Sequence, residues 1–249
     1  MKKIIAVVIL ALIAIAVCFM FENHKPGNTA DEIRQTVVEQ RDILQQIAKP
    51  ISKPQVVCPI DFVSLQELNP DIYAWLEIPD VVSLPVVNRP GDDSYYHRKA
   101  IDGSYSLAGS LYTEDYNTRD FSDPVTVIYG HNMNTDEMFS TLESSYSSKE
   151  FFDTHPDFTI YMPNETKEYT IAAAVPYGNI HILDSYDFNN KMIFRLFFED
   201  VMKVRKLNAN FNDSIKIEPD DHIVILSTCL TGNDSNRYLV VAVEKNKNN

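Results

Sequence analysis

The stretch Asp221–Glu244, DHIVILSTCLTGNDSNRYLVVAVE, has the pattern of two strands joined by a polar segment. The apolar runs IVIL and YLVVAV at its two ends are rich in β-branched residues, which favours strands of a buried sheet. Between them, the residues from Leu230 to Arg237 are mostly turn formers, and they predict a loop. Cys229 ends the first strand and Arg237 begins the second. Because adjacent strands pair, we expect the thiol and the guanidinium to lie together.

A thiol beside a cation suggests a nucleophile, because cysteine attacks as the thiolate and a neighbouring positive charge favours that form. A nucleophile also needs a partner for proton transfer. His131 is the best candidate, since it follows the run VTVIYG, which reads as a strand ending in Gly130. The other histidines have weaker settings in the sequence, and they are His24, His97, His155, His181 and His222.

Three short motifs in this order resemble the sortase transpeptidases, and class B most of all. They are YGHNM at 129–133, LSTC at 226–229, and an arginine eight positions after the cysteine. Together they are more specific than a lone cysteine. The resemblance covers the chain from about Asp61 to its end. Further matching pieces are Ile72–Ile78, Leu84–Val87, Gly109–Asn117 and Met138–Phe139.

The resemblance implies a cysteine transpeptidase. Cys229 would attack a threonine carbonyl within the C-terminal sorting motif of a surface protein and form an acyl-enzyme. His131 would be the general acid for the leaving amine and then the base for an incoming amine, from peptidoglycan or its lipid-linked precursor. Arg237 would hold the substrate and the oxyanion.

Residues next to the cysteine are expected to contact the substrate, and they are Ser227, Thr228 and Leu230. Leu230 departs from the family pattern, because some class B members carry an acidic residue directly after the cysteine. This departure leaves the preferred sorting motif open.

Composition limits the other functions. A chain of 249 residues with 45% hydrophobic residues can bury one sizeable core. Its formal net charge of −13 excludes nucleic acid as a partner, because phosphates require a basic face. Histidines and cysteines do not occur at metal-ligand spacings, and Gly-rich phosphate loops and Gly-x-Ser-x-Gly are absent. We therefore expect no cofactor and no metal.

The N-terminus predicts attachment to a membrane. Residues 4–21 are eighteen consecutive apolar residues, close to the ~20 that span a bilayer core. Lys2 and Lys3 place residues 1–3 in the cytoplasm and the catalytic domain outside the cell. A cleaved secretory signal and a lipoprotein site at Cys18 are the alternatives, but a clear small-x-small cleavage site is missing before Glu22.

Residues 22–57 predict a helical stalk. The sequence TADE at 29–32 matches a capping box, and an apolar stripe follows as far as Lys49. Such a helix could be a spacer, a lid on the domain, or a packing helix at the edge of its core. Three prolines then interrupt the chain, so the catalytic domain is placed at 58–249.

The rest of the chain predicts a mainly β fold with peripheral helices, a closed barrel of about eight strands like that of the sortases. The expected strands are Tyr73–Ile78, Leu84–Val87, Gly109–Thr113, Val125–Tyr129, Phe158–Tyr161, Tyr169–Val175, Ile223–Thr228 and Tyr238–Val243. Asn164–Lys167 predicts a hairpin turn, and Phe62–Leu68 a short helix. Lys191–Lys206 predicts a long helix whose apolar stripe comprises Ile193, Leu196, Phe197, Val201 and Val204. A long helix at this place is a feature of class B sortases.

Other interpretations remain open at this point. The thiol and imidazole could belong to an exported cysteine peptidase that hydrolyses its substrate. Alternatively, Cys58 and Cys229 could form a structural disulfide in a surface domain that only binds. Arg237 could form an exposed salt bridge with Asp234 or another acid, and an isolated histidine such as His131 could be structural.

Overall fold

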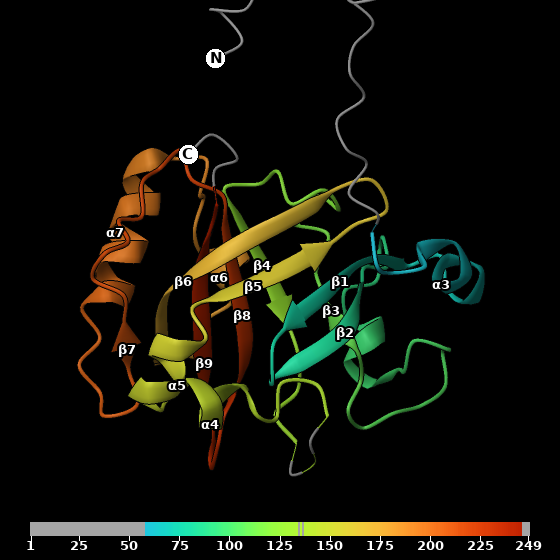
Figure 1. Ribbon diagram of the computed structural model, residues 1–249, viewed down its shortest axis with the longest axis horizontal. Coiled ribbons are helices and arrows are strands. Elements are labelled where there is room, and N and C mark those ends of the chain that lie inside the picture. The colour runs from blue at the N-terminus through green and yellow to red at the C-terminus, as the bar shows by residue number, and fades with distance from the viewer. Residues whose placement is uncertain (1–57, 134, 136, 246–249) are drawn as a thin grey trace, which may run out of the picture. The chain divides into compact units, whose positions relative to one another are not determined.

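The computed structural model describes residues 58–133, 135 and 137–245 (Figure 1). The predicted cytoplasmic residues 1–3, the anchor 4–21 and the stalk 22–57 lie outside the described residues. Within the described part of the chain, helices that are both long and apolar enough to cross a membrane are absent.

Eight strands close into a barrel, as the sequence predicted. Each strand pairs with the next in the order β1, β2, β3, β4, β8, β9, β6 and β5, and β5 pairs with β1 to close the ring. The pairs β2–β3 and β4–β8 are parallel, and the other pairs in the ring are antiparallel. The strands are β1 Ile72–Ile78, β2 Val82–Val87, β3 Leu111–Tyr112, β4 Val125–Tyr129, β5 Asp157–Tyr161, β6 Thr166–Gly178, β8 Ile223–Leu230 and β9 Asn233–Glu244. A short strand, β7 (Asn210–Phe211), adds to β6 outside the ring.

Alternation along the strands separates two cores. On β8, Val224 and Leu226 join the cluster that fills the barrel, with partners such as Tyr238 on β9. Ile223 and Ile225 point the other way, into a cluster on the outside of the barrel wall. Because side chains alternate between the two faces of a strand, this division fixes which residues further along β8 face outward.

Helix α7 (Lys191–Met202) covers the outer cluster, and it lies beside β6, β8 and β9 in Figure 1. It begins at the N-cap Asn190 and ends four residues before the predicted end at Lys206. The predicted apolar stripe was partly wrong, because Leu196 is 59% exposed. The buried face consists instead of Phe194, Phe197, Phe198 and Val201, which have helical spacing and place three aromatic rings on the barrel wall.

The remaining helices are short. The predicted helix α3 (Phe62–Leu68) is present, and its N-cap Asp61 accepts a hydrogen bond from the Ser64 backbone N–H. The sequence did not predict the others, which are η1 Tyr95–Arg98, α4 Leu142–Tyr146, α5 Lys149–Thr154 and α6 Ile182–Ser185.

Two connections are tighter than the sequence predicted. The expected loop Leu230–Arg237 is a hairpin, in which β8 continues to Leu230 and β9 begins at Asn233. Gly232 in the turn has φ of 72°, a conformation that favours glycine. The polar residues after it are strand residues at an exposed end of the sheet, so they resemble a loop in composition. Similarly, β6 begins at Thr166, so the turn predicted at Asn164–Lys167 ends two residues earlier.

Candidate active site

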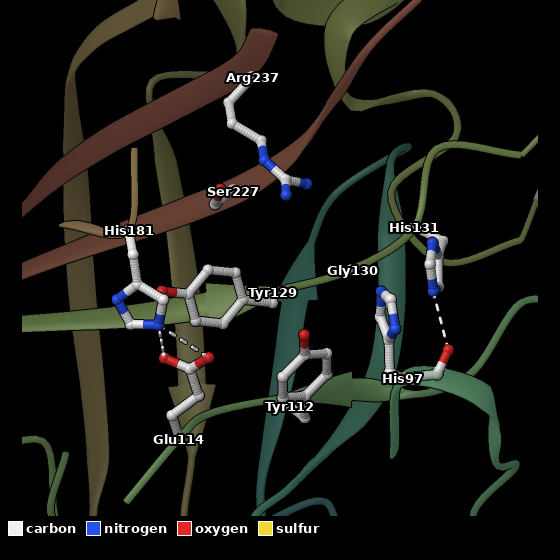
Figure 2. Close-up of a pocket in the computed structure, with 9 residues that line it drawn as sticks. All are labelled: His97, Tyr112, Glu114, Tyr129, Gly130, His131, His181, Ser227 and Arg237. Carbon is white, nitrogen blue, oxygen red and sulfur yellow. Dashed lines mark hydrogen bonds and ion pairs between the residues drawn. The ribbon is translucent and has the colours of Figure 1, made fainter. Parts of the chain in front are cut away.

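A pocket lies on the outer face of the barrel wall, where β3, β4, β8 and β9 meet (Figure 2). It is open to solvent. The residues that line it are His97, Tyr112, Glu114, Tyr129, Gly130, His131, His181, Ser227 and Arg237. The strand alternation explains this location, because Tyr129 packs against the same outer cluster as Ile225 and Leu239.

Cys229 and Arg237 are directly opposite each other in the β8–β9 pair. The guanidinium donates a hydrogen bond from Nη1 to Cys229 Sγ over 3.1 Å, which confirms the predicted contact. Its Nε donates to Asn179 Oδ1 over 2.8 Å, so the group is held from two sides. Cys229 is not itself among the lining residues, but it is partly exposed and Arg237 connects it to the pocket. The guanidinium therefore places a positive charge and a hydrogen-bond donor beside the sulfur.

The structure contradicts the disulfide interpretation. Cys58 and Cys229 are both free thiols. Cys58 packs against a separate apolar cluster that includes Phe62 and Ile72. For Arg237, the side chain of the alternative partner Asp234 lies outside the described residues. Among the acids whose side chains are described, none forms an ion pair with Arg237.

His131 follows β4 directly after Gly130 and lines the pocket. Its Nε2 lies 2.8 Å from the backbone carbonyl oxygen of His97. Because a carbonyl only accepts, Nε2 carries a proton, and in the neutral ring Nδ1 is the basic nitrogen. The imidazole therefore contacts His97 and not the thiol. Catalytic hydrogen bonds often form only when substrate is bound, so this geometry is compatible with a role in proton transfer.

His97 is a pocket residue that the sequence analysis missed, because its surroundings in the sequence are a charged loop. Its ring stacks on His131 with centroids 4.5 Å apart and an interplanar angle of 28°. Desolvation lowers the pKa of His97, and the positive charges of His131 and Arg98 lower it further. His97 is therefore a neutral surface against which the His131 ring packs at neutral pH.

Asn132 connects the histidine loop to the cysteine strand. Its side-chain Nδ2 donates to the Cys229 carbonyl oxygen and to Thr231 Oγ1, both over 2.9 Å. The Thr231 backbone N–H in turn donates to Glu143 Oε2 over 2.7 Å. These bonds fix the β8–β9 hairpin relative to the loop after β4, so the segments that carry the imidazole and the thiol are held together.

The three predicted substrate contacts have different environments. Ser227 has the outward orientation of Cys229 and lines the pocket, although it is only 3% exposed. Thr228 has the opposite orientation and is completely buried, so its side chain does not line the pocket. Leu230 is partly buried and packs against the cluster inside the barrel. The prediction treated neighbouring residues alike, whereas alternation along β8 separates them.

Glu114 and His181 are two further pocket residues that the sequence analysis missed. Glu114 follows β3, and His181 is the N-cap of α6. Their side chains meet at the end of the pocket away from His131 (Figure 2), with His181 Nε2 3.0 Å from Glu114 Oε2. No sequence pattern predicts this contact, because Glu114 and His181 are 67 residues apart. In the described part of the chain, clusters of three or more potential metal-ligating side chains are absent.

Gly130 is required by close packing. A Cβ atom at this position would lie 2.5 Å from side-chain carbons of both Leu111 and Phe139. We expect Gly130→Ala to lower the free energy of unfolding by about 1–3 kcal/mol, the usual cost of overpacking a core, in a urea titration. Gly178→Ala is the control, because a Cβ there has open space. Equal stabilities of the two variants would contradict this account of Gly130.

Comparisons with known proteins place this fold and pocket in a family. A search of family models found no match. Sortase B of Listeria monocytogenes is 32% identical over 171 residues, which cover 68% of this chain and 67% of that protein. Sortase B of Staphylococcus aureus is 24% identical over 249 residues, which cover 98% of this chain and 97% of that protein.

The comparison of structures agrees with the sequence relatives. The crystal structure of Clostridium perfringens sortase B superposes with a TM-score of 0.66 at 24% identity, and it covers 75% of this chain and 100% of that one. This likeness shows that the eight-stranded barrel is the sortase fold. The identity to the Listeria protein, over two thirds of both chains, shows the family. The chain belongs to the class B sortases, a family of cysteine transpeptidases.

Proposed function

We propose that this sortase is membrane-anchored, cleaves a C-terminal sorting motif after threonine, and joins the cargo protein to an amine of the cell-wall peptidoglycan. The observation that carries the proposal is the 3.1 Å contact between Arg237 Nη1 and Cys229 Sγ, beside a pocket that His131 also lines. A thiol next to a guanidinium and near an imidazole has what acyl transfer requires: a nucleophile, a donor for the oxyanion and a group that moves protons.

In the first half of the reaction, the Cys229 thiolate attacks the threonine carbonyl carbon. Negative charge then develops on the carbonyl oxygen, and the N–H groups of Arg237 stabilise it. Protonated His131 gives a proton to the amide nitrogen, the C–N bond breaks, and the C-terminal peptide leaves as an amine. The product is a thioester between threonine and Cys229.

In the second half, neutral His131 takes a proton from the incoming amine, and the amine nitrogen attacks the thioester carbonyl. The new amide forms as the C–S bond breaks, and the thiolate is regenerated beside Arg237. The amine comes from peptidoglycan or from its lipid-linked precursor. The stacking on His97 and the hydrogen bond to its carbonyl keep the His131 ring at the pocket through both steps.

Substrate contacts are proposed for residues at the pocket. Ser227 lines it, and Leu230 lies one residue beyond the thiol at the hairpin. Thr228 acts only through its backbone, because its side chain is completely buried.

The location is proposed from the sequence alone. The apolar run 4–21 and the two lysines before it favour a single-pass anchor with the N-terminus inside. The catalytic domain is then outside the cell, where cargo proteins with C-terminal sorting signals and lipid-linked wall precursors are both accessible.

Deletion of Met1–His24 tests whether the anchor serves only location. We expect a soluble, folded and active domain, because the apolar run is separate in sequence from the barrel strands. Gel filtration, thermal melting and peptide cleavage check the three properties. An aggregated or inactive product that keeps residues 25–249 would contradict this separation.

The chemical proposal is tested by following the fate of the acyl group. The soluble domain is incubated with a library of threonine-containing sorting peptides, with and without triglycine, and the products are analysed by mass spectrometry. We expect amine-linked products whose yield rises with triglycine concentration. Slow hydrolysis is expected only without the amine. Hydrolysis at an unchanged rate and without amine-linked product would favour the cysteine peptidase.

A further inference from the structure

The carboxylate of Glu114 is a charged group in the pocket that the proposed reaction does not use. It lies at the end of the pocket opposite to His131, and Arg237 enters from another side (Figure 2). Its side chain is only 13% exposed. A carboxylate so little hydrated is costly to keep charged unless a partner compensates it.

His181 contacts this carboxylate without neutralising it. The His181 Nε2 donates a hydrogen bond to Glu114 Oε1 over 3.2 Å and lies 3.0 Å from Oε2. The other ring nitrogen, Nδ1, accepts a hydrogen bond from the Asp184 backbone N–H over 3.1 Å as the N-cap of α6. A ring that donates from Nε2 and accepts at Nδ1 is the neutral tautomer. His181 therefore orients Glu114 and leaves its negative charge in place.

A cationic partner from the protein is missing for this charge. Among the described residues, lysines and arginines within ion-pair distance of Glu114 are absent. Burial raises the pKa of Glu114 and outweighs the contact with His181, which lowers it, and the negative charge of Asp93 raises it further. A cation bound from outside would offset both the desolvation and the like-charge repulsion.

The walls beside Glu114 are aromatic. Tyr112 and Tyr129 stack with centroids 5.4 Å apart, and Tyr129 also lies 6.5 Å from the His181 ring. Burial, followed by the negative charge of Glu114, raises the pKa of Tyr129, so its hydroxyl stays protonated. Aromatic rings around a carboxylate form a favourable environment for a small ammonium group, because the ring faces attract cations.

We infer that Glu114, held by neutral His181 and flanked by Tyr112 and Tyr129, binds a primary ammonium group of the substrate. The inference rests on the proposed function and assigns a site to one of its substrate groups. Two sources have this chemistry, the protonated acceptor amine before it moves to His131, and a lysine side chain of the sorting peptide. Arg237 repels a cation from the other side of the pocket, so the ammonium is directed to the Glu114 end.

Glu114→Gln tests the inference, since it removes the charge and keeps the shape and the oxygen that accepts from His181. Two ratios distinguish the sources, and both use a peptide that the wild type cleaves. The first is the triglycine concentration for half-maximal amine-linked product in the variant relative to wild type. The second is the cleavage rate of a lysine-containing peptide relative to its norleucine counterpart, without amine. If Glu114 binds the acceptor amine, we expect the variant to need about tenfold more triglycine than wild type. If it binds a peptide lysine, we expect the advantage of the lysine peptide over the norleucine peptide to fall about tenfold in the variant.

Glu199→Gln is the matched control, because Glu199 lies on α7 away from the pocket and its loss changes the net charge equally. Glu199→Gln should need the same triglycine concentration as wild type and should show the same preference for the lysine peptide over the norleucine peptide. A folded Glu114→Gln variant with both ratios at the wild-type value would overturn the inference and leave the transpeptidase intact. A wild-type enzyme that gives no amine-linked product would instead overturn the proposed function.

The unmodified enzyme provides a second measurement that does not depend on folding of a variant. The tert-butylammonium ion has the shape of tert-butanol but carries a charge, and it is too hindered to react readily as an acceptor. We expect it to inhibit the wild-type reaction at about tenfold lower concentration than the alcohol. Equal inhibition by the two compounds would contradict a cation site in the pocket.

Discussion

Cys229→Ala is expected to reduce turnover by at least about 10⁴-fold, the scale for removing a catalytic nucleophile. The substitution removes the atom that forms the thioester, and no other described thiol lies at the pocket. Folding should be retained, because Cys229 is partly exposed and Arg237 keeps its bond to Asn179. Peptide cleavage, amine-linked product and thermal melting are measured on the same sample.

Cys58→Ala is the matched control, since Cys58 is also a free, partly buried thiol but packs in a different cluster. It should keep wild-type turnover. Turnover that survives in Cys229→Ala would mean that another group is the nucleophile. A Cys229→Ala variant that fails to fold would show instead that the thiol is structural.

Arg237→Lys should reduce turnover by ~100-fold or more, which is the scale for removing an oxyanion donor. The guanidinium reaches Cys229 Sγ with Nη1 while Nε holds Asn179. A lysine ammonium is a compact point charge, so it cannot keep both contacts in the same planar geometry. The variant is therefore informative, because it retains the charge and changes only the arrangement of donors.

Thermal stability of Arg237→Lys should change little, because exposed polar contacts contribute below about 1 kcal/mol. Arg205→Lys is the control, since Arg205 donates to the backbone carbonyls of Met202 and Val204 at the C-terminal end of α7 and does not line the pocket. It should have wild-type turnover. Near-normal turnover of Arg237→Lys would leave Arg237 without the role in the oxyanion that we propose.

Local pattern was sufficient to predict the strands around the thiol. The β-branched runs before Cys229 and after Arg237 are strands, and their hairpin pairing alone brings the thiol and the guanidinium together. The same reasoning placed His131 at the end of a strand, β4, but it did not predict that β4 pairs with the cysteine strand β8. These predictions succeeded because each depends on residues that are close together in the sequence.

The rest of the pocket depends on contacts between distant segments. His97 reaches His131 across 34 residues, and Glu114 reaches His181 across 67. Periodicity and turn chemistry carry no information about such contacts, so both pairs were missed. The burial of the Thr228 side chain was not predicted, because the alternation of β8 was not applied to the residues beside Cys229.

The site of acylation tests the central claim most directly. Wild-type enzyme is mixed with a cleaved sorting peptide, quenched in acid and digested with trypsin. Fragment Ile217–Arg237 contains Cys229 and no other cysteine. We predict that this fragment carries the part of the peptide that ends in threonine, as an adduct that hydroxylamine removes and that is absent from Cys229→Ala. An adduct on any other fragment, or amine-linked product that forms at full rate in Cys229→Ala, would contradict the account.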